Sequence, residues 1–200
     1  LLPNFVDGTT LPAISRSDLD TPKGVPLLVA LGRLHTNKAF DVLITALAQT
    51  PDVWLWIAGE GPEKENLQAL AERLAVADRV RFAGWRDDTA ALYAAADIFV
   101  CPSRHEPLGN VVIEAWAQHC PVIAADASGP KALIDDGVNG SLVPMEDAKA
   151  LAKSIRRLVD DPETGKALAA AGHAAYLEAF TEQAVVQQYF GFFSSITDKT

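Results

Sequence analysis

Short apolar runs alternate with longer amphipathic segments along the chain from Val25 onward. The short runs predict six strands, and the segments between them, with apolar residues at helical spacing, predict six helices. The expected strands span residues 26–31, 53–58, 79–83, 97–101, 121–125 and 141–143. The expected helices span residues 39–49, 63–76, 88–95, 110–118, 129–135 and 147–159. After Pro162 the pattern is helical to the end, with a break near Thr181, which suits a helix N-cap.

The predicted strands are nearly continuous apolar runs, as in residues 27–31 and 98–101. Runs of this kind are typical of a parallel sheet that is covered on both faces. Their alternation with helices predicts an α/β fold with a doubly wound, mostly parallel, six-stranded, Rossmann-like sheet. We expect residues 1–24 to be a linker and lead-in, residues 25–180 to be the domain, and residues 181–200 to form a terminal helix.

The composition narrows the class of protein. Hydrophobic residues make up 49% of the 200 residues, and 26 acidic residues against 17 basic ones give a net charge of -9. Such an acidic balance argues against a nucleic-acid partner. The longest apolar run, residues 25–31, is too short to span a bilayer. Cys101 and Cys120 each have apolar neighbours, which predicts reduced core thiols in a reducing compartment.

The start of the chain has neither an initiator nor a leader pattern. The only methionine is Met145, and residues 1–10 lack the basic-then-apolar layout of a signal peptide. We therefore expect the chain to be a piece of a longer protein.

Glycine, polar and charged residues follow each of the first five predicted strands. Turns between strands and helices need such residues in any case, so a single loop decides little. In a doubly wound sheet, however, ligands bind beyond the carboxyl ends of the strands. Five such loops in succession favour a ligand-binding rim at that edge.

Two cations follow the first strand, next to a glycine that lets the backbone approach a ligand. Arg33 can fork two oxygens and Lys38 supplies a point charge, so the pair beside Gly32 suits a diphosphate. The alternatives are that Lys38 is only solvated at a helix start and that Arg33 pairs with Glu60.

The helix that starts at Asn110 is apolar on nearly every side, which is typical of a buried helix. We place Asn110 as its cap. Its only charge is Glu114, and a carboxylate there needs hydrogen bonds, which a sugar or ribose diol would supply. Glu106 lies in the preceding loop, and the amides of Leu108, Gly109 and Asn110 are placed to hold a phosphate. The alternative is that Glu114 leans toward solvent.

Several common site patterns are missing from the sequence. Gly59 and Gly61 are followed by Lys64 where a dinucleotide fingerprint needs glycine, and there is no P-loop pattern. The four histidines and two cysteines never fall at metal-ligand spacing. These absences weaken dehydrogenase, P-loop and metal-centre readings.

The stretch from Glu106 to Glu114 resembles the E-x7-E motif of retaining GT-B glycosyltransferases, in particular glycosyltransferase family 4. Five further landmarks resemble that family in the same order: G-R-L with a following lysine at 32–38, G-x-G-P at 59–62, F-x-G at 82–84, A-D with P-S at 96–103, and P-V-I-A at 121–124. A D-G-x-N-G turn follows at 136–140. Each landmark is weak alone, but their order over about residues 2–193 is specific.

The resemblance implies the C-terminal, nucleotide-sugar-binding half of a GT-B enzyme. Residues 3–7 look like the linker between its halves, and the terminal helix is expected to pack on an N-terminal domain. By resemblance, Arg33 and Lys38 bind the donor diphosphate, Glu106 contacts the donor sugar, and Glu114 holds the ribose. The implied catalytic residues are Glu106, Arg33 and Lys38. The implied substrate-binding residues are Glu114, Gly32, Leu108, Gly109, Asn110, Trp85, Arg86 and Gly61, with the backbone around Trp85 and Arg86 meeting the base.

The resemblance implies no metal or cofactor beyond the nucleoside-diphosphate sugar, which is a substrate. It implies a saccharide or lipid-linked acceptor, and a cytoplasmic location that can include the inner face of the membrane. The sequence departs from the family at Ala39 and His119, where glycine is usual, and Ala39 is expected to shift a helix start. Two alternatives stay open: a nucleotide-sugar 2-epimerase of the same fold, and a non-catalytic nucleotide-sugar-binding module.

Overall fold

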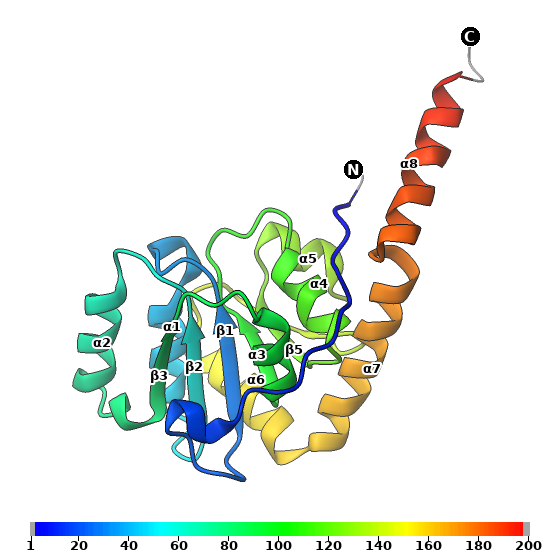
Figure 1. The fold of residues 1–200 in the computed structure, drawn as a ribbon. Helices are drawn as coiled ribbons and strands as arrows, with labels where there is room; N and C mark the ends of the chain where they lie inside the picture. The colour runs from blue at the N-terminus through cyan, green and yellow to red at the C-terminus, as the bar shows by residue number, and fades with distance from the viewer. Residues whose placement is uncertain (1–2, 198–200) are drawn as a thin grey trace.

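The computed structural model describes residues 3–197 as a six-stranded sheet between two layers of helices (Figure 1). The strands are β1 (Leu27–Leu31), β2 (Trp54–Ala58), β3 (Val80–Gly84), β4 (Ile98–Cys101), β5 (Val122–Ala125) and β6 (Ser141–Val143). Their order is β3-β2-β1-β4-β5-β6, and every neighbouring pair is parallel. The predicted doubly wound α/β fold is confirmed. Because the strand order reverses between β1 and β4, that is where such a sheet opens a ligand crevice.

The helices connect the strands as the apolar pattern predicts. They are α1 (Phe40–Leu47), α2 (Lys64–Arg73), α3 (Thr89–Ala95), α4 (Asn110–Ala117), α5 (Ser128–Leu133), α6 (Ala148–Asp160), α7 (Pro162–Ala179) and α8 (Glu182–Thr197). Short 3-10 turns occur at η1 (Arg16–Leu19), η2 (Thr36–Lys38) and η3 (Ala77–Arg79). Helix ends differ most from prediction where the backbone turns left-handed. Thus α2 stops at Arg73 instead of residue 76, since Ala75 has a φ of 55°.

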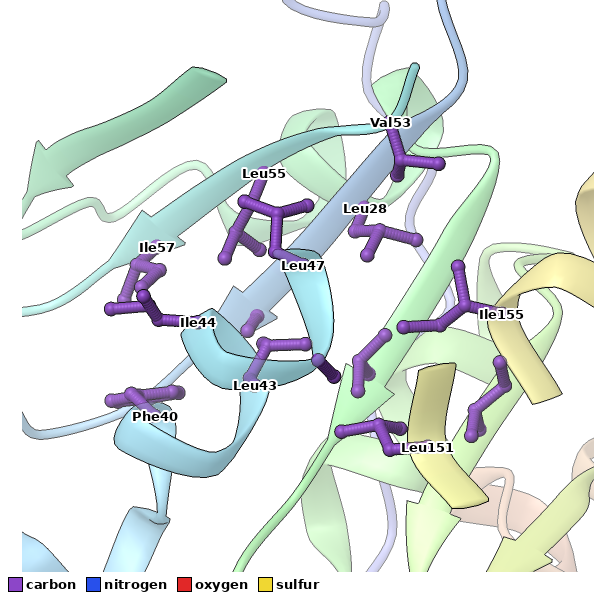
Figure 2. Packing of buried hydrophobic residues seen from close by; sticks show 14 of the residues in the cluster. Leu28, Phe40, Leu43, Ile44, Leu47, Val53, Leu55, Ile57, Leu151 and Ile155 are labelled. Carbon is purple, nitrogen blue, oxygen red and sulfur yellow. The ribbon is translucent and has the colours of Figure 1, made fainter. Parts of the chain in front are cut away.

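The alternation of side chains along β1 divides the core into two layers. Leu28 and Ala30 point to the face that α1, α2 and α6 cover, as Figure 2 shows for Leu43 of α1 and Ile155 of α6. Leu27 and neighbouring odd-numbered positions point to the other face, which α3 and α4 cover. The side chains on both faces of β1 are buried, which explains why this strand reads as an unbroken apolar run.

The lead-in before β1 lies against the domain. Thr21 is buried and its hydroxyl accepts a hydrogen bond from Nε1 of Trp56 at 2.8 Å. Farther back, the amide of Val6 donates to the carbonyl of Phe180 at 3.1 Å, and the Tyr176 hydroxyl donates to the Val6 carbonyl at 3.1 Å. The first described residues therefore meet the chain where α7 ends.

Helix α7 packs closely on α4. A Cβ atom on Gly172 would lie 2.3 Å from Cδ1 of Trp116, so the approach requires glycine. At the end of α4, His119 has a φ of 54° and its ring stacks on His173 with centroids 3.5 Å apart. The sequence-based expectation that His119 takes the place of a helix-ending glycine is confirmed.

Helix α8 begins after the predicted cap, because the amide of Ala184 donates to the Thr181 hydroxyl at 3.2 Å. It extends beyond the body of the domain (Figure 1) and exposes apolar side chains such as Phe190. The predicted segments 1–24 and 181–200 include residues 1–2 and 198–200, which lie outside the described residues. Over the described part of the chain, no helix combines the length and apolar character needed to cross a membrane.

Candidate functional site

Glycines bring the loops after β1 and β2 into backbone contact. Gly32 and Gly59 have φ values of 144° and 142°, which side chains disfavour. A Cβ atom on Gly59 would lie 2.0 Å from the Gly32 carbonyl oxygen, and one on Gly61 would lie 2.3 Å from the Leu34 carbonyl oxygen. Glycine at positions 59 and 61 therefore permits the two loops to approach closely, and Gly32 lines the pocket described next.

A pocket of about 190 Å³ opens at the carboxyl ends of β1 and β2, beside α4. The structure brings together there five residues that the sequence singled out: Gly32, Arg33, Trp85, Arg86 and Glu114. They come from the loops after β1 and β3 and from helix α4, as expected for a crevice where the strand order reverses.

Arg33 is exposed at this pocket. Within residues 3–197 it forms no ion pair, and Glu60 instead binds Lys64 at 3.2 Å. The alternative pairing of Arg33 with Glu60 is therefore not observed. The Arg33 guanidinium is available to an anionic ligand.

Lys38 and Glu106 form an ion pair across the loops after β1 and β4. The Lys38 Nζ atom lies 2.5 Å from Oε2 of Glu106, and the Glu106 side chain is only 10% exposed. The Lys38 stem runs beside Gly32, where an added Cβ would lie 3.1 Å from its Cε. Lys38 is thus held at the site, and the alternative of a merely solvated lysine is not observed. The sequence selected both residues but did not predict that they pair.

Glu114 lies half-buried on α4, and its Oε2 accepts a hydrogen bond from the Tyr93 hydroxyl at 2.9 Å. Burial raises the pKa of Glu114, the Tyr93 hydrogen bond opposes that rise, and the charge of Glu106 adds to it. The alternative that Glu114 leans into solvent is not observed. Tyr93 was missed because a tyrosine in an apolar helix gives the same signal as a core aromatic.

The loop before α4 corrects one prediction. Gly109, not Asn110, is the N-cap, and its φ of 72° is left-handed. Asn110 is the first helical residue, and no side chain among the described residues caps the helix. A Cβ on Gly109 would lie 2.7 Å from Cδ1 of Leu133, so the N-cap position leaves no room for a capping side chain. In the described chain, the amides of Leu108, Gly109 and Asn110 donate no hydrogen bond, and that of Gly109 is buried against Gly129.

Three predicted residues have other neighbours as well. The Trp85 ring is 75% exposed at the pocket mouth, and its Nε1 donates to Asp87 at 2.9 Å. Arg86 forks Asp88 at 2.8 and 2.6 Å, so its charge is already balanced. Asn110 also lines a separate hollow of about 460 Å³ between the lead-in and α8.

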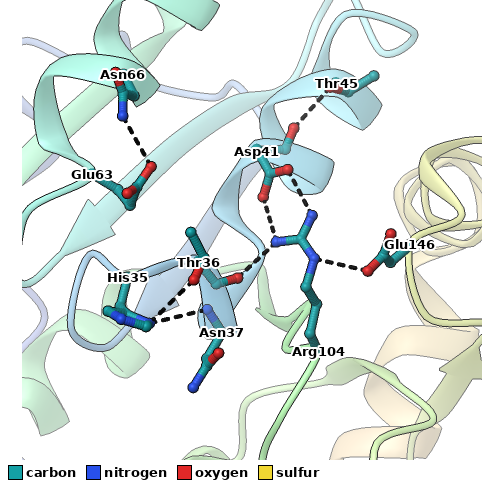
Figure 3. A network of polar contacts seen from close by, with 9 residues as sticks. All are labelled: His35, Thr36, Asn37, Asp41, Thr45, Glu63, Asn66, Arg104 and Glu146. Atoms are coloured by element: carbon teal, nitrogen blue, oxygen red, sulfur yellow. Dashed lines mark hydrogen bonds and ion pairs between the residues drawn. The ribbon is translucent and has the colours of Figure 1, made fainter.

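Arg104 is the second residue that sequence reasoning missed. It contacts Asp41, Glu146 and the carbonyl of Thr36, which places it behind the turn that carries Lys38 (Figure 3). The signal was an arginine two positions before Glu106, but its partners lie 42 to 68 residues away in sequence.

No group of three or more potential metal ligands occurs among the residues that the structure describes. A larger hollow, of about 580 Å³, lies at the opposite edge of the sheet, at the amino ends of β1 and β4. Its charged lining residues include Arg16 and Asp97, which bind each other at 2.9 Å. Of the predicted site residues, Arg33, Arg86 and Glu114 line the smaller pocket instead.

Comparison with known proteins decides the family. The model of the family described as glycosyl transferases group 1 matches residues 13–175. The chain belongs to the glycosyl transferases group 1 family. Its fold is accordingly the Rossmann-like domain that GT-B glycosyltransferases share.

Two relatives of this group 1 domain come from Rhizobium meliloti (strain 1021). The lipopolysaccharide core biosynthesis glycosyltransferase LpsE is 41% identical over 98% of this chain and 57% of its own length. The corresponding enzyme LpsD is 37% identical over 96% of this chain and 56% of its own. The chain thus spans little more than half the length of these relatives.

Solved structures agree with this assignment. Sucrose-phosphate synthase from Thermosynechococcus elongatus superposes with a TM-score of 0.88 at 29% identity, covering 100% of this chain and 53% of that one. Anabaena Alr3699/HepE, in complex with UDP and glucose, superposes with a TM-score of 0.84 at 31% identity, covering 90% of this chain and 50% of that one.

Proposed function

We propose that this group 1 domain binds a nucleoside-diphosphate sugar and is the donor-binding half of a retaining glycosyltransferase. The observation that carries the proposal is the convergence of Arg33, the Lys38–Glu106 pair and Glu114 at the carboxyl edge of the sheet. Among residues 3–197, one cation without an ion pair, two carboxylates and amides that donate no hydrogen bond match the chemistry of a sugar nucleotide.

The diphosphate would lie between Arg33, Lys38 and the open end of α4. Charge develops on the leaving diphosphate as the bond to the sugar breaks, and fixed cations stabilise that charge without reorganising. Arg33 and Lys38 supply two such cations. In this proposal they do the work that a metal ion does in other transferases, and no cofactor takes part.

Glu106 would contact the donor sugar, since it stands beside Lys38 in the loop before α4. Glu114 would bind the ribose diol with the carboxylate oxygen that Tyr93 leaves free. The base would meet the loop of Trp85 and Arg86 at the pocket mouth. HepE is described in complex with UDP, and with UDP-glucose, which favours uridine as the nucleoside here.

The acceptor, saccharide or lipid-linked, would be held by a separate N-terminal domain, on which the exposed face of α8 packs. Phe190 is one of several apolar side chains exposed on that helix. A cytoplasmic location follows from the proposed use of nucleotide sugars. On this view the 200-residue chain binds donor but transfers sugar at a negligible rate.

Calorimetric titration with UDP, GDP, ADP and their glucose or mannose conjugates tests the proposal. One nucleotide series should bind, and Glu114→Ala should weaken it at least tenfold, which is about 1.4 kcal/mol. Asp97→Asn, at the opposite edge of the sheet, is the control and should leave affinity unchanged. Binding that Glu114→Ala does not weaken, or no binding to any of the nucleotides, would contradict the proposal.

A further inference from the structure

We propose that Arg104 is a positioning residue that holds the turn of Lys38 against the loop of Glu106. The inference rests on the proposed function of Lys38 and Glu106 in donor binding. It assigns to Arg104 no contact with the donor.

The Arg104 guanidinium joins three segments of the chain (Figure 3). Its two terminal nitrogens fork the Asp41 carboxylate at 2.9 and 2.7 Å, and Nη1 also donates to the Thr36 carbonyl at 2.7 Å. Its Nε donates to Oε1 of Glu146 at 2.9 Å. A forked arginine–carboxylate pair fixes orientation as well as distance.

Backbone amides of the Arg104 loop also bind the turn that carries Lys38. The amides of Arg104 and His105 both donate to the Asn37 carbonyl, at 2.9 and 3.2 Å. Lys38 follows directly, and Glu106 follows His105. The hydrogen bonds of Arg104 therefore fix the two segments that carry the ion pair.

Arg104 also spans a strained residue. Ala39 has a φ of 51°, a conformation that a side chain disfavours. Arg104 binds the chain on both sides of it, at the Thr36 carbonyl before and at Asp41 after. Since the turn and α1 meet at this strained link, a contact to both sides holds the turn in one orientation.

Arg104 is unsuited to bind a donor phosphate itself. Four of its hydrogen bonds go to protein acceptors, and two carboxylates already face its charge. The hydrogen bond to Asp41 raises the pKa of Arg104 most, burial opposes that rise, and the hydrogen bond to Glu146 adds to it. Lys38 has one carboxylate partner among the described residues and stands at the rim. Lys38 therefore binds the diphosphate, and Arg104 holds Lys38 in position.

Amide hydrogen exchange of Arg104→Lys gives a test that needs no ligand. Lysine keeps the charge but cannot fork a carboxylate. The amides of Lys38, Ala39 and Val42, which are hydrogen-bonded within the turn, should exchange at least tenfold faster, while the strands are unchanged. Asp41→Asn should give the same pattern. Unchanged exchange in this turn would overturn the inference.

Arg156→Lys is the matched control. Arg156 also faces two carboxylates, Asp52 and Asp160, and its side chain is 33% exposed against 29% for Arg104, but it lies on α6. It should leave exchange in the Lys38 turn unchanged. An equal effect of Arg156→Lys would show general loosening and overturn the inference.

Affinities for UDP and uridine distinguish a positioning role of Arg104 from a purely structural one. Arg104→Lys should lower the affinity for UDP at least tenfold and leave the affinity for uridine unchanged, because only UDP carries the diphosphate. In a Lys38→Ala background, Arg104→Lys should cost nothing further. Faster exchange with unaltered UDP affinity would overturn the inference. If the wild-type chain binds neither compound, the proposed function fails, and the exchange results alone then decide whether Arg104 holds the turn.

Discussion

The two edges of the sheet differ in a way that volume alone does not reveal. The amino edge has the larger hollow, about 580 Å³ against 190 Å³ at the carboxyl edge. At the amino edge, however, Asp97 already accepts from Arg16 and from the Leu27 amide. At the carboxyl edge, in the part of the chain that the structure describes, Arg33 forms no ion pair. Capacity to bind a polar ligand follows the groups that folding leaves available, not the size of the space.

Glycine substitutions should give the largest difference between the edges. Gly59→Ala places a Cβ on the Gly32 carbonyl and should lower the free energy of unfolding by about 3 kcal/mol or more. Gly24, at the amino edge, also has positive φ, but no atom of the described residues lies within 4 Å of its added Cβ. Gly24→Ala should cost only about 1 kcal/mol. Urea denaturation measures both, and equal losses would contradict the comparison.

Lysine substitutions come next. Lys38→Met leaves the carboxylate of Glu106 mostly buried without its cation, which should cost about 2 kcal/mol of unfolding free energy. Lys166 at the amino edge pairs with Glu163, but these side chains are 73% and 81% exposed. Lys166→Met should therefore produce no measurable change in the same denaturation experiment. A stable Lys38→Met variant would mean that Glu106 gains nothing from the pair.

Replacing a carboxylate by an amide should change the free energy of unfolding in opposite directions at the two edges. Asp97→Asn should cost about 1 kcal/mol, because Asp97 accepts from Leu27 and Arg16. Glu114→Gln should instead stabilise the folded chain at pH 7 by up to about 1 kcal/mol. The same variant should lower the affinity for UDP at least tenfold.

The sign for Glu114 follows from its pKa. Burial raises that pKa in the folded chain, so the folded state favours the proton and its advantage is lost as pH rises through the folded value. The gain from Glu114→Gln should therefore disappear below the ordinary pKa of 4.5. Denaturation at pH 4 and pH 7 measures this, and destabilisation at pH 7 would contradict it.

The smallest effect should come from His119 at the amino edge. Burial, and then the charge of His173, lower the His119 pKa below its ordinary 6.5. The unfolded chain therefore binds more protons just below pH 6.5, so stability is full above that pH and falls as pH drops toward the folded pKa. Because the ring is exposed, the difference should be on the order of 0.3 kcal/mol.

His119→Asn tests this dependence, since asparagine tolerates the left-handed backbone. The variant should lose the part of the pH dependence that His119 contributes, as measured by denaturation at pH 5.5 and 7.5. An unchanged profile would assign that dependence to other groups.

The sequence predicted the fold almost completely because continuous apolar strands leave little choice of architecture. The six strands agree with prediction within one residue at each end. Five predicted site residues, four from loops and Glu114 from a helix, line one pocket. Helix ends were less predictable, because left-handed residues such as Ala39 and Gly109 decide them.

What the sequence could not supply was contact between distant segments. Tyr93 reaches Glu114 only because α3 and α4 lie on the same face of the sheet. Arg104 reaches Asp41 only because β1 and β4 are neighbours. Tyr93 and Arg104 each contact a site residue, or the turn that carries one, from a distant part of the sequence. No local sequence pattern distinguishes such a contact from ordinary core packing.

Burial of Cys101 and Cys120 makes the natural thiols poor targets for chemical labelling. Both are buried and unbridged, as their apolar neighbours predicted, and burial raises the pKa of each thiol above its ordinary value. Maleimide reagents need an accessible thiolate. A single cysteine introduced at exposed Leu108 would therefore carry a fluorophore beside the site with both native cysteines left in place.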